Sequence, residues 1–148
     1  MSFEEYTDHV KNGVVCEFLA AAWFESNGFT VSWPSDSTVE YDFIADNKTE
    51  RQRVQVKKIY YDNAKKRFIG GMSTTHKTSD GSNHYKKYKA DSFDICAFVC
   101  VELNAIYIVP GEYVYRRSSI TFYPDNKKIY KRPFDFERFK RVLIQINE

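Results

Sequence analysis

Residues 39–58 read VEYDFIADNKTERQRVQVKK, and this stretch decides how the rest of the sequence is interpreted. Residues 39–45 and 51–61 are rich in β-branched and aromatic side chains, which predicts two strands. Between them, the polar residues 46–50 are typical of a turn. The stretch therefore predicts two adjacent strands that form a hairpin.

Several polar side chains fall on one face of this predicted hairpin. Gln55 and Lys57 are two residues apart, so they share a face of the strand. If Asp46 pairs with Arg51 across the turn, the same register pairs Asp42 with Gln55, and directly paired residues share a face. This register would group a carboxylate, an amide and an amine, whereas a slip of one residue would separate them. The alternative is an ordinary cross-strand pair on a solvated face, which contributes under about 1 kcal/mol.

Glu17 is the only charged residue in the run of residues 14–24, VVCEFLAAAWF. The run lies in a helix predicted over residues 3–27 and ended by Gly28. Because the run is apolar nearly all round the helix, we expect packing on more than one side. An ionised carboxylate there is costly unless it is paired, hydrogen-bonded or bound to a cation. Glu17 is therefore expected to point into the cleft where Asp42, Gln55 and Lys57 converge; the alternative is a carboxylate at the edge of the packed face that reaches water.

The remaining segments predict a mixed α/β domain around one sheet. Further strands are predicted at residues 29–33, 66–72, 93–102, 105–109 and 113–123, the last as a strand or a hairpin. Helices are predicted at residues 84–90 and 134–146, and the closing one has apolar residues at helical spacing. No repeat or linker divides the chain, so a single domain over residues 1–148 is expected.

The composition points to a folded chain with an uneven charge distribution. Hydrophobic residues make up 43% of the 148 residues and aromatic residues 17%, which excludes a disordered chain. The formal net charge of +2 conceals a cancellation: residues 1–47 carry −8, residues 48–90 carry +9 and residues 91–148 carry +1. The basic middle third favours a polyanionic partner.

The compartment follows from the termini and the cysteines. Residues 1–11 are polar and acidic, unlike a signal peptide, and the longest apolar run is too short to cross a bilayer. Cys16, Cys96 and Cys100 are odd in number and lack the partners of a zinc site. We expect free buried thiols in a cytoplasmic protein without a membrane partner.

Taken together, the polar residues resemble the PD-(D/E)XK nuclease superfamily. The pattern is a helical Glu (Glu17), an Asp on a strand (Asp42) and a (D/E/Q)-x-K motif on the next strand (Gln55-Val56-Lys57). The spacings of 25 and 13 residues and the Gln in third position resemble the group I intron homing endonucleases of cyanobacterial type. Segments 93–99 and 106–110 are similar to later strands of that family. The resemblance implies a restriction-endonuclease-like core, a central mixed β-sheet flanked by helices in the order αβββαβ.

The sequence departs from the nominal motif of the superfamily at two positions. Tyr41 stands where the motif has Pro, a position without a chemical role. Gln55 stands where the motif has Asp or Glu, which removes one negative charge from a metal site. An amide oxygen still ligates a hard cation, although more weakly than a carboxylate does.

The resemblance implies a divalent-metal-dependent endonuclease that cuts double-stranded DNA at a specific site, as intron homing enzymes do. Asp42, the Gln55 amide oxygen and the Val56 carbonyl would hold Mg²⁺, or Mn²⁺ in its place, with Glu17 bound directly or through water. The metal would lower the pKa of a bound water and neutralise charge on the phosphate. Lys57 would orient that water and stabilise the transition state.

Basic residues that follow the site are predicted to bind the DNA backbone. They are Lys58, Lys65, Lys66, Arg67, Lys77, Lys86, Lys87 and Lys89. In the hydrogen-bonding run of residues 73–79, Thr75, His76 and Lys77 are candidates for reading base edges. The alternative is a solvated lysine face with scattered tyrosines.

Assembly and function class leave alternatives open. One domain carries one active site, so cutting both strands requires at least a dimer, and the resemblance suggests a tetramer. A Holliday-junction resolvase would use the same four residues but recognise DNA shape. A non-catalytic DNA-binding domain on a decayed nuclease scaffold is favoured by Gln55, and a scaffold that does not bind nucleic acid would show no salt-dependent DNA affinity.

Overall fold

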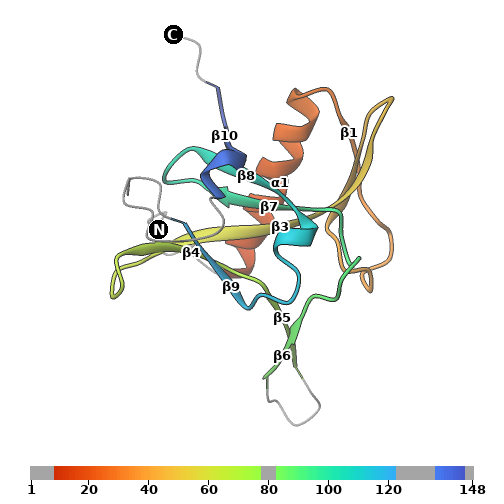
Figure 1. The fold of residues 1–148 in the computed structure, drawn as a ribbon. Helices are drawn as coiled ribbons and strands as arrows, with labels where there is room; N and C mark the ends of the chain where they lie inside the picture. Colours follow the sequence, from red (N-terminus) through yellow and green to blue (C-terminus); the bar gives the residue numbers. More distant parts are fainter. Residues whose placement is uncertain (1–8, 78–82, 123–135, 146–148) are drawn as a thin grey trace, which may run out of the picture.

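The computed structural model describes residues 9–77, 83–122 and 136–145, and their side chains except those of residues 9–11 and 73–87. Within these ranges the chain forms one α-helix, α1 (His9–Ser26), and is otherwise built mainly of strands (Figure 1). Residues 3–8 of the predicted first helix lie outside the described ranges. Gly28 has a positive φ of 88° just past the helix, which is the conformation that ends many helices. The first predicted helix is confirmed over its described part.

The strands form an eight-stranded sheet in the described part of the chain (Figure 1). Its main path runs β1–β2–β3–β7–β8–β10, and β4 pairs with β3 and with β9. The β3–β7 pair is parallel and its other pairs are antiparallel, so the sheet is mixed, which confirms the α/β fold class. The bounds are β1 (Thr30–Ser32), β2 (Phe43–Asp46), β3 (Arg51–Asp62), β4 (Arg67–Gly71), β7 (Ile95–Cys100), β8 (Ala105–Pro110), β9 (Ser119–Phe122) and β10 (Lys140–Val142).

Each face of the sheet carries its own hydrophobic core. Alternate residues of β7 belong to different clusters, as expected when successive side chains point to opposite faces. On one face α1 packs through Cys16, Ala20 and Phe24. On the other, β4 and β9 cover β7 and β8; a Cβ added to Gly70 of β4 would come within 2.8 Å of the Phe98 ring, so this close approach requires glycine.

The predicted turn register is confirmed. Asp46 pairs with Arg51, and the β2–β3 ladder runs back from there to Phe43 and Val54. The predicted strands over residues 29–33, 66–72, 93–102 and 105–109 are confirmed as β1, β4, β7 and β8, with bounds shifted by a few residues. Cys16, Cys96 and Cys100 are free and buried, as expected.

The predicted helix over residues 84–90 is wrong. Residues 83–87 form β6 (Asn83–Lys87), which pairs with β5 (Ser73–Lys77) in a separate two-stranded sheet. Figure 1 shows this hairpin projecting from the main sheet. The middle helix of the expected αβββαβ order is therefore replaced by strand pairing, because each polar segment satisfies the backbone of the other. Residues 78–82 lie outside the described ranges.

The predicted closing helix is also wrong. Within the described part of residues 134–146, a 3₁₀ helix η3 (Phe136–Phe139) leads into β10, which pairs with β8. Phe136, Phe139 and Leu143 still pack against the cores, whereas Val142 is 52% exposed, so these apolar residues do not form one buried helical face. Of the predicted strand or hairpin at 113–123, residues 119–122 form β9, and a 3₁₀ helix η2 (Gly111–Tyr113) precedes it. No helix of the described residues is long and apolar enough to cross a membrane.

Candidate active site

The candidate site lies where β2 stops pairing with β3. The last pair of their ladder is Phe43 with Val54. The Asp42 N–H donates to the Val54 carbonyl over 2.8 Å, and the Asp42 carboxylate oxygen Oδ2 accepts from the Val56 N–H over 2.7 Å. The predicted Asp42–Gln55 ladder pair is thus not formed, because a side-chain carboxylate takes over the backbone donor of β3 at this point.

Glu17 reaches this carboxylate from α1. Its side chain is hydrogen-bonded to that of Asp42, and this contact raises the pKa of Glu17 and lowers that of Asp42. Burial, together with the charge of Asp42, raises the pKa of Glu17 to about 7. Burial also raises the pKa of Asp42, against the lowering effects of the Val56 N–H, Glu17 and Lys57. The expected approach of Glu17 to Asp42 is observed.

Lys57 brings a positive charge to the same place. Burial lowers the pKa of its amine, while Cys96 and Asp42 act in the opposite direction. Its Nζ lies 4.9 Å from the centre of the Tyr88 ring. A partly buried amine near an aspartate whose own pKa is shifted is an arrangement that clusters at functional sites.

Gln55 lies next to these groups but does not bond to either acid. The side chain is 8% exposed, and its Nε2 donates a long hydrogen bond of 3.4 Å to the Val56 carbonyl. In the parallel β3–β7 ladder Gln55 pairs with Cys96, and the next residue, Val56, pairs with Ala97. Among the described residues, the predicted set therefore divides into a bonded pair, Glu17 with Asp42, and two neighbours, Gln55 and Lys57.

The donor set suits a hard divalent cation. The Glu17 and Asp42 carboxyl groups approach each other at a place where a positive charge would be favourable, and Gln55 and Val56 offer neutral oxygens nearby. Within the described ranges, no group of three or more His, Cys, Asp or Glu side chains could hold a metal. The site thus offers two acids and neutral oxygens rather than the nitrogen and sulfur ligands typical of zinc.

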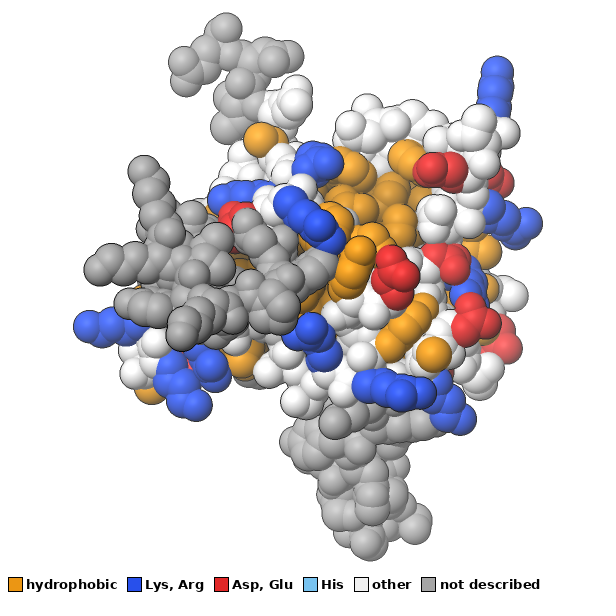
Figure 2. All heavy atoms as spheres, viewed as in Figure 1, with side chains coloured by type: hydrophobic (Ala, Val, Ile, Leu, Met, Phe, Trp, Pro, Cys, Tyr) orange, Lys and Arg blue, Asp and Glu red, His pale blue; other side chains and the backbone are white. Residues whose placement is uncertain are grey.

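The predicted DNA-binding residues of the β3–β4 region are spread over two places. Lys58 is exposed, and its charge acts on Cys16, on the α1 side of the sheet. Lys65 and Lys66 are exposed in the β3–β4 turn, while Arg67 is half-buried with its Nε 3.8 Å from Asp62. Figure 2 shows Lys and Arg side chains on the left margin of the visible face, where β3 and β4 end, and Asp and Glu side chains gathered at its right.

The other predicted contact residues belong to the projecting hairpin or its base. Lys89 follows β6 and is exposed. The remaining five lie on β5 and β6, where His76 pairs with His84 and Thr75 with Tyr85, and their side chains are outside the described set. They are Thr75, His76, Lys77, Lys86 and Lys87.

Two features near the site were not predicted from the sequence. Tyr88 packs under the Lys57 amine, and the pKa of Tyr88 is raised by burial and by Asp42. Ser92 donates from its hydroxyl to the Glu40 carboxylate near the same ring. Alternating Lys and Tyr residues marked this segment as basic and aromatic, but nothing in the local pattern indicated which tyrosine turns inward.

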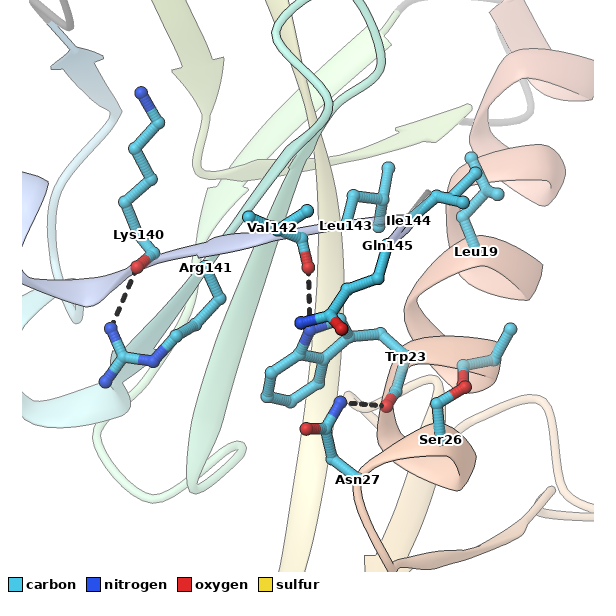
Figure 3. Close-up of a pocket in the computed structure, with 11 residues that line it drawn as sticks. Leu19, Trp23, Ser26, Asn27, Lys140, Arg141, Val142, Leu143, Ile144 and Gln145 are labelled. Atoms are coloured by element: carbon cyan, nitrogen blue, oxygen red, sulfur yellow. Dashed lines mark hydrogen bonds between the residues drawn. The ribbon is translucent and has the colours of Figure 1, made fainter. Parts of the chain in front are cut away.

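A groove between α1 and β10 lies apart from these residues. Figure 3 shows Trp23 of α1 in it, with its Nε1 donating to the Val142 carbonyl over 3.1 Å. Its lining includes Leu19, Asn27 and Gln145 but none of the four predicted catalytic residues. The groove therefore takes no part in the candidate site.

A family model described as PD-(D/E)XK endonuclease matches residues 8–140. The chain belongs to the PD-(D/E)XK endonuclease family. The match confirms the superfamily resemblance and extends it past residue 110, through η3 to the start of β10. A search of the curated proteins found no match.

The same fold is seen in the solved structure of a homing endonuclease. The bacterial homing endonuclease I-Ssp6803I superposes with a TM-score of 0.73 at 19% sequence identity, covering 86% of this chain and 85% of that one. The structure of MepB gives a TM-score of 0.43 at 12% identity, over 78% and 85% of the two chains. This PD-(D/E)XK chain therefore has the fold of a restriction-endonuclease-like homing enzyme.

Proposed function

We propose that this PD-(D/E)XK endonuclease hydrolyses double-stranded DNA at a specific site with Mg²⁺ and acts in intron homing. The observation that carries the proposal is the hydrogen-bonded Glu17–Asp42 pair beside the buried Lys57 amine. The fold shared with a bacterial homing endonuclease supports the homing role.

The proposed chemistry assigns a task to each group. Glu17, Asp42, the Gln55 amide oxygen and the Val56 carbonyl would hold the divalent ion. When bound, the ion supplies an acidified water and neutralises charge on the phosphate. Asp42 is fixed for this task by the Val56 N–H, and Lys57 orients the attacking water and stabilises the negative charge that develops on the phosphate.

The partners follow from charge and from the number of active sites. The basic residues around β3, β4 and the β5–β6 hairpin would bind the DNA backbone, and Thr75, His76 and Lys77 would read bases. Because one chain carries one candidate site, a double-strand cut requires a homo-oligomer, a dimer at least and a tetramer by resemblance. The proposed location is the cytoplasm, supported by three cysteines that are free and buried.

Gln55 favours a second candidate function. The neutral amide leaves two acids in the site, and its described hydrogen bond goes to Val56 rather than to them. A non-catalytic DNA-binding domain would retain the fold and the basic surface while losing metal-dependent cleavage.

The test is a cleavage assay on plasmid and genomic DNA, with Mg²⁺, with Mn²⁺ and with a chelator, followed by mapping of the cut ends. The proposal expects divalent-dependent double-strand cuts that map to one sequence. Cuts that follow branched structure rather than sequence would indicate a junction resolvase. DNA binding without any divalent-dependent cleavage would favour the non-catalytic domain and contradict the proposal.

A further inference from the structure

Tyr88 occupies a position between the projecting hairpin and the candidate active site. It directly follows β6 in the chain, and it is 4% exposed. Its ring belongs to the core cluster that also contains Phe93 and Cys96. The centre of this ring lies 4.9 Å from the Nζ atom of Lys57. That distance is within the range in which an ammonium is attracted to an aromatic face.

The ring is held firmly by its surroundings. It packs edge-on against Phe93, with ring centres 5.2 Å apart and an interplanar angle of 77°. Phe93 in turn contacts the ring of Tyr115, whose hydroxyl donates to the Phe93 carbonyl. A ring packed in this way cannot follow the amine, so the amine must adapt to the ring.

Lys57 needs such a constraint because its own bonds do not supply one. A lysine has a flexible four-carbon stem and a point charge without directional preference. Among the described side chains it forms no ion pair within 4.0 Å, although its charge acts on Asp42 and Cys96. The Tyr88 ring is the described contact that fixes the position of the ammonium.

We infer that Tyr88 is a positioning residue, whose ring holds the Lys57 ammonium beside Asp42 in the geometry that cleavage requires. The inference rests on the proposed function, because it assigns Lys57 to the chemistry. Tyr88 is also the first residue after β6, so the Lys57 amine lies near the base of the projecting hairpin. The lysine and the base of the hairpin therefore share one rigid element.

The test compares Tyr88→Leu, which removes the aromatic face, with Tyr88→Phe, which keeps it and removes the hydroxyl. We expect Tyr88→Leu to lower the single-turnover cleavage rate roughly tenfold and to leave the Kd for DNA within about twofold of the parent. Tyr88→Phe should cleave at the parent rate. Parent-like cleavage by Tyr88→Leu, or an equal loss in Tyr88→Phe, would overturn the inference.

A measurement on the parent protein tests the contact without relying on any variant. In NMR spectra of lysine-labelled protein, the ε-methylene protons of Lys57 should be shifted upfield by the ring current of Tyr88. Signals of Lys57 at the same position as those of exposed lysines would contradict the inference. If the parent shows the upfield shift but cleaves no DNA, the proposed function fails while the contact stands. If the parent cleaves DNA and Tyr88→Leu is unimpaired, only the positioning role fails.

Discussion

Two basic residues on the same face of β3, Arg53 and Lys57, each face an aspartate with opposite consequences. Arg53 donates from Nε and Nη2 to the Asp94 carboxylate, both over 3.1 Å, and from Nη2 to Asp91 over 2.9 Å. These bonds raise the pKa of Arg53 and lower that of Asp94, so both groups stay ionised. The pair holds the start of β7 against β3, and its charges are satisfied.

The pKa values of Lys57 and Asp42 are shifted in the opposite directions, down for the lysine and up for the aspartate. Burial lowers the pKa of the lysine and raises that of the aspartate, so each charge is held at a cost. Arg53 and Lys57 are only four residues apart on β3. An ion pair with satisfied charges supports the fold, whereas partly desolvated charges that form no close ion pair are available to a substrate, a cation or a proton.

The largest effect is expected from removing the Asp42 charge. Asp42→Asn keeps an oxygen for the Val56 N–H but removes one of the two acids, so we expect cleavage to fall on the order of a thousandfold. The free energy of unfolding should be unchanged or higher, because a buried charge is lost. Rates and urea unfolding curves measure the two effects. The control is Asp46→Asn, an exposed acid at the far end of β2, and equal losses in both variants would contradict this contrast.

Adding a negative charge to the candidate site should increase its affinity for a divalent cation. Gln55→Glu restores the acid of the nominal motif, and we expect half-maximal cleavage at a roughly tenfold lower divalent concentration. A titration of Mg²⁺ and Mn²⁺ measures this shift. Gln52→Glu, on the same strand and outside the site, is the control. An unchanged metal requirement in Gln55→Glu would mean that residue 55 does not contact the ion.

Removing the Arg53 ion pairs should lower the free energy of unfolding rather than the cleavage rate. Arg53→Met removes the bonds to Asp91 and Asp94, and the free energy of unfolding should fall by about 2 kcal/mol. Cleavage per folded molecule should stay at the parent level. A loss of cleavage larger than the loss of folded protein would assign Arg53 to the site and remove the contrast.

The smallest expected effect is a pH slope in stability. The pKa of Glu17 is about 7 in the folded chain against an ordinary value of 4.5. Between these values the folded state binds more protons than the unfolded state, so the metal-free protein should lose stability as pH rises. Glu17→Gln should flatten this slope in thermal unfolding with a chelator present. Equal slopes in parent and variant would mean that the pKa of Glu17 is not raised in the folded chain.

Residues whose local chemistry fixes their environment could be predicted from the sequence. The polar turn at residues 46–50 fixed the Asp46–Arg51 register, and the cost of an unpaired charge on an apolar helix placed Glu17 near Asp42. The resemblance to the PD-(D/E)XK superfamily was carried by residues of the same segments, and the match of the family model confirms it.

Features set by distant partners could not be predicted. Polar residues 73–77 and 83–87 carry little periodicity, and only their mutual pairing makes them strands. Residues 140–142 have helical spacing, but the open edge of β8 recruits them as a strand. Asp42 leaves the ladder because its side chain, rather than its backbone, bonds to Val56, which the register alone does not reveal.

The most direct test of the central claim is divalent-dependent cleavage by Lys57→Ala beside Lys48→Ala, an exposed lysine in the β2–β3 turn. The account predicts that Lys57→Ala loses cleavage on the order of a hundredfold or more, while its Kd for DNA stays near that of the parent. Lys48→Ala should match the parent in both measurements. Undiminished cleavage by Lys57→Ala would contradict the account.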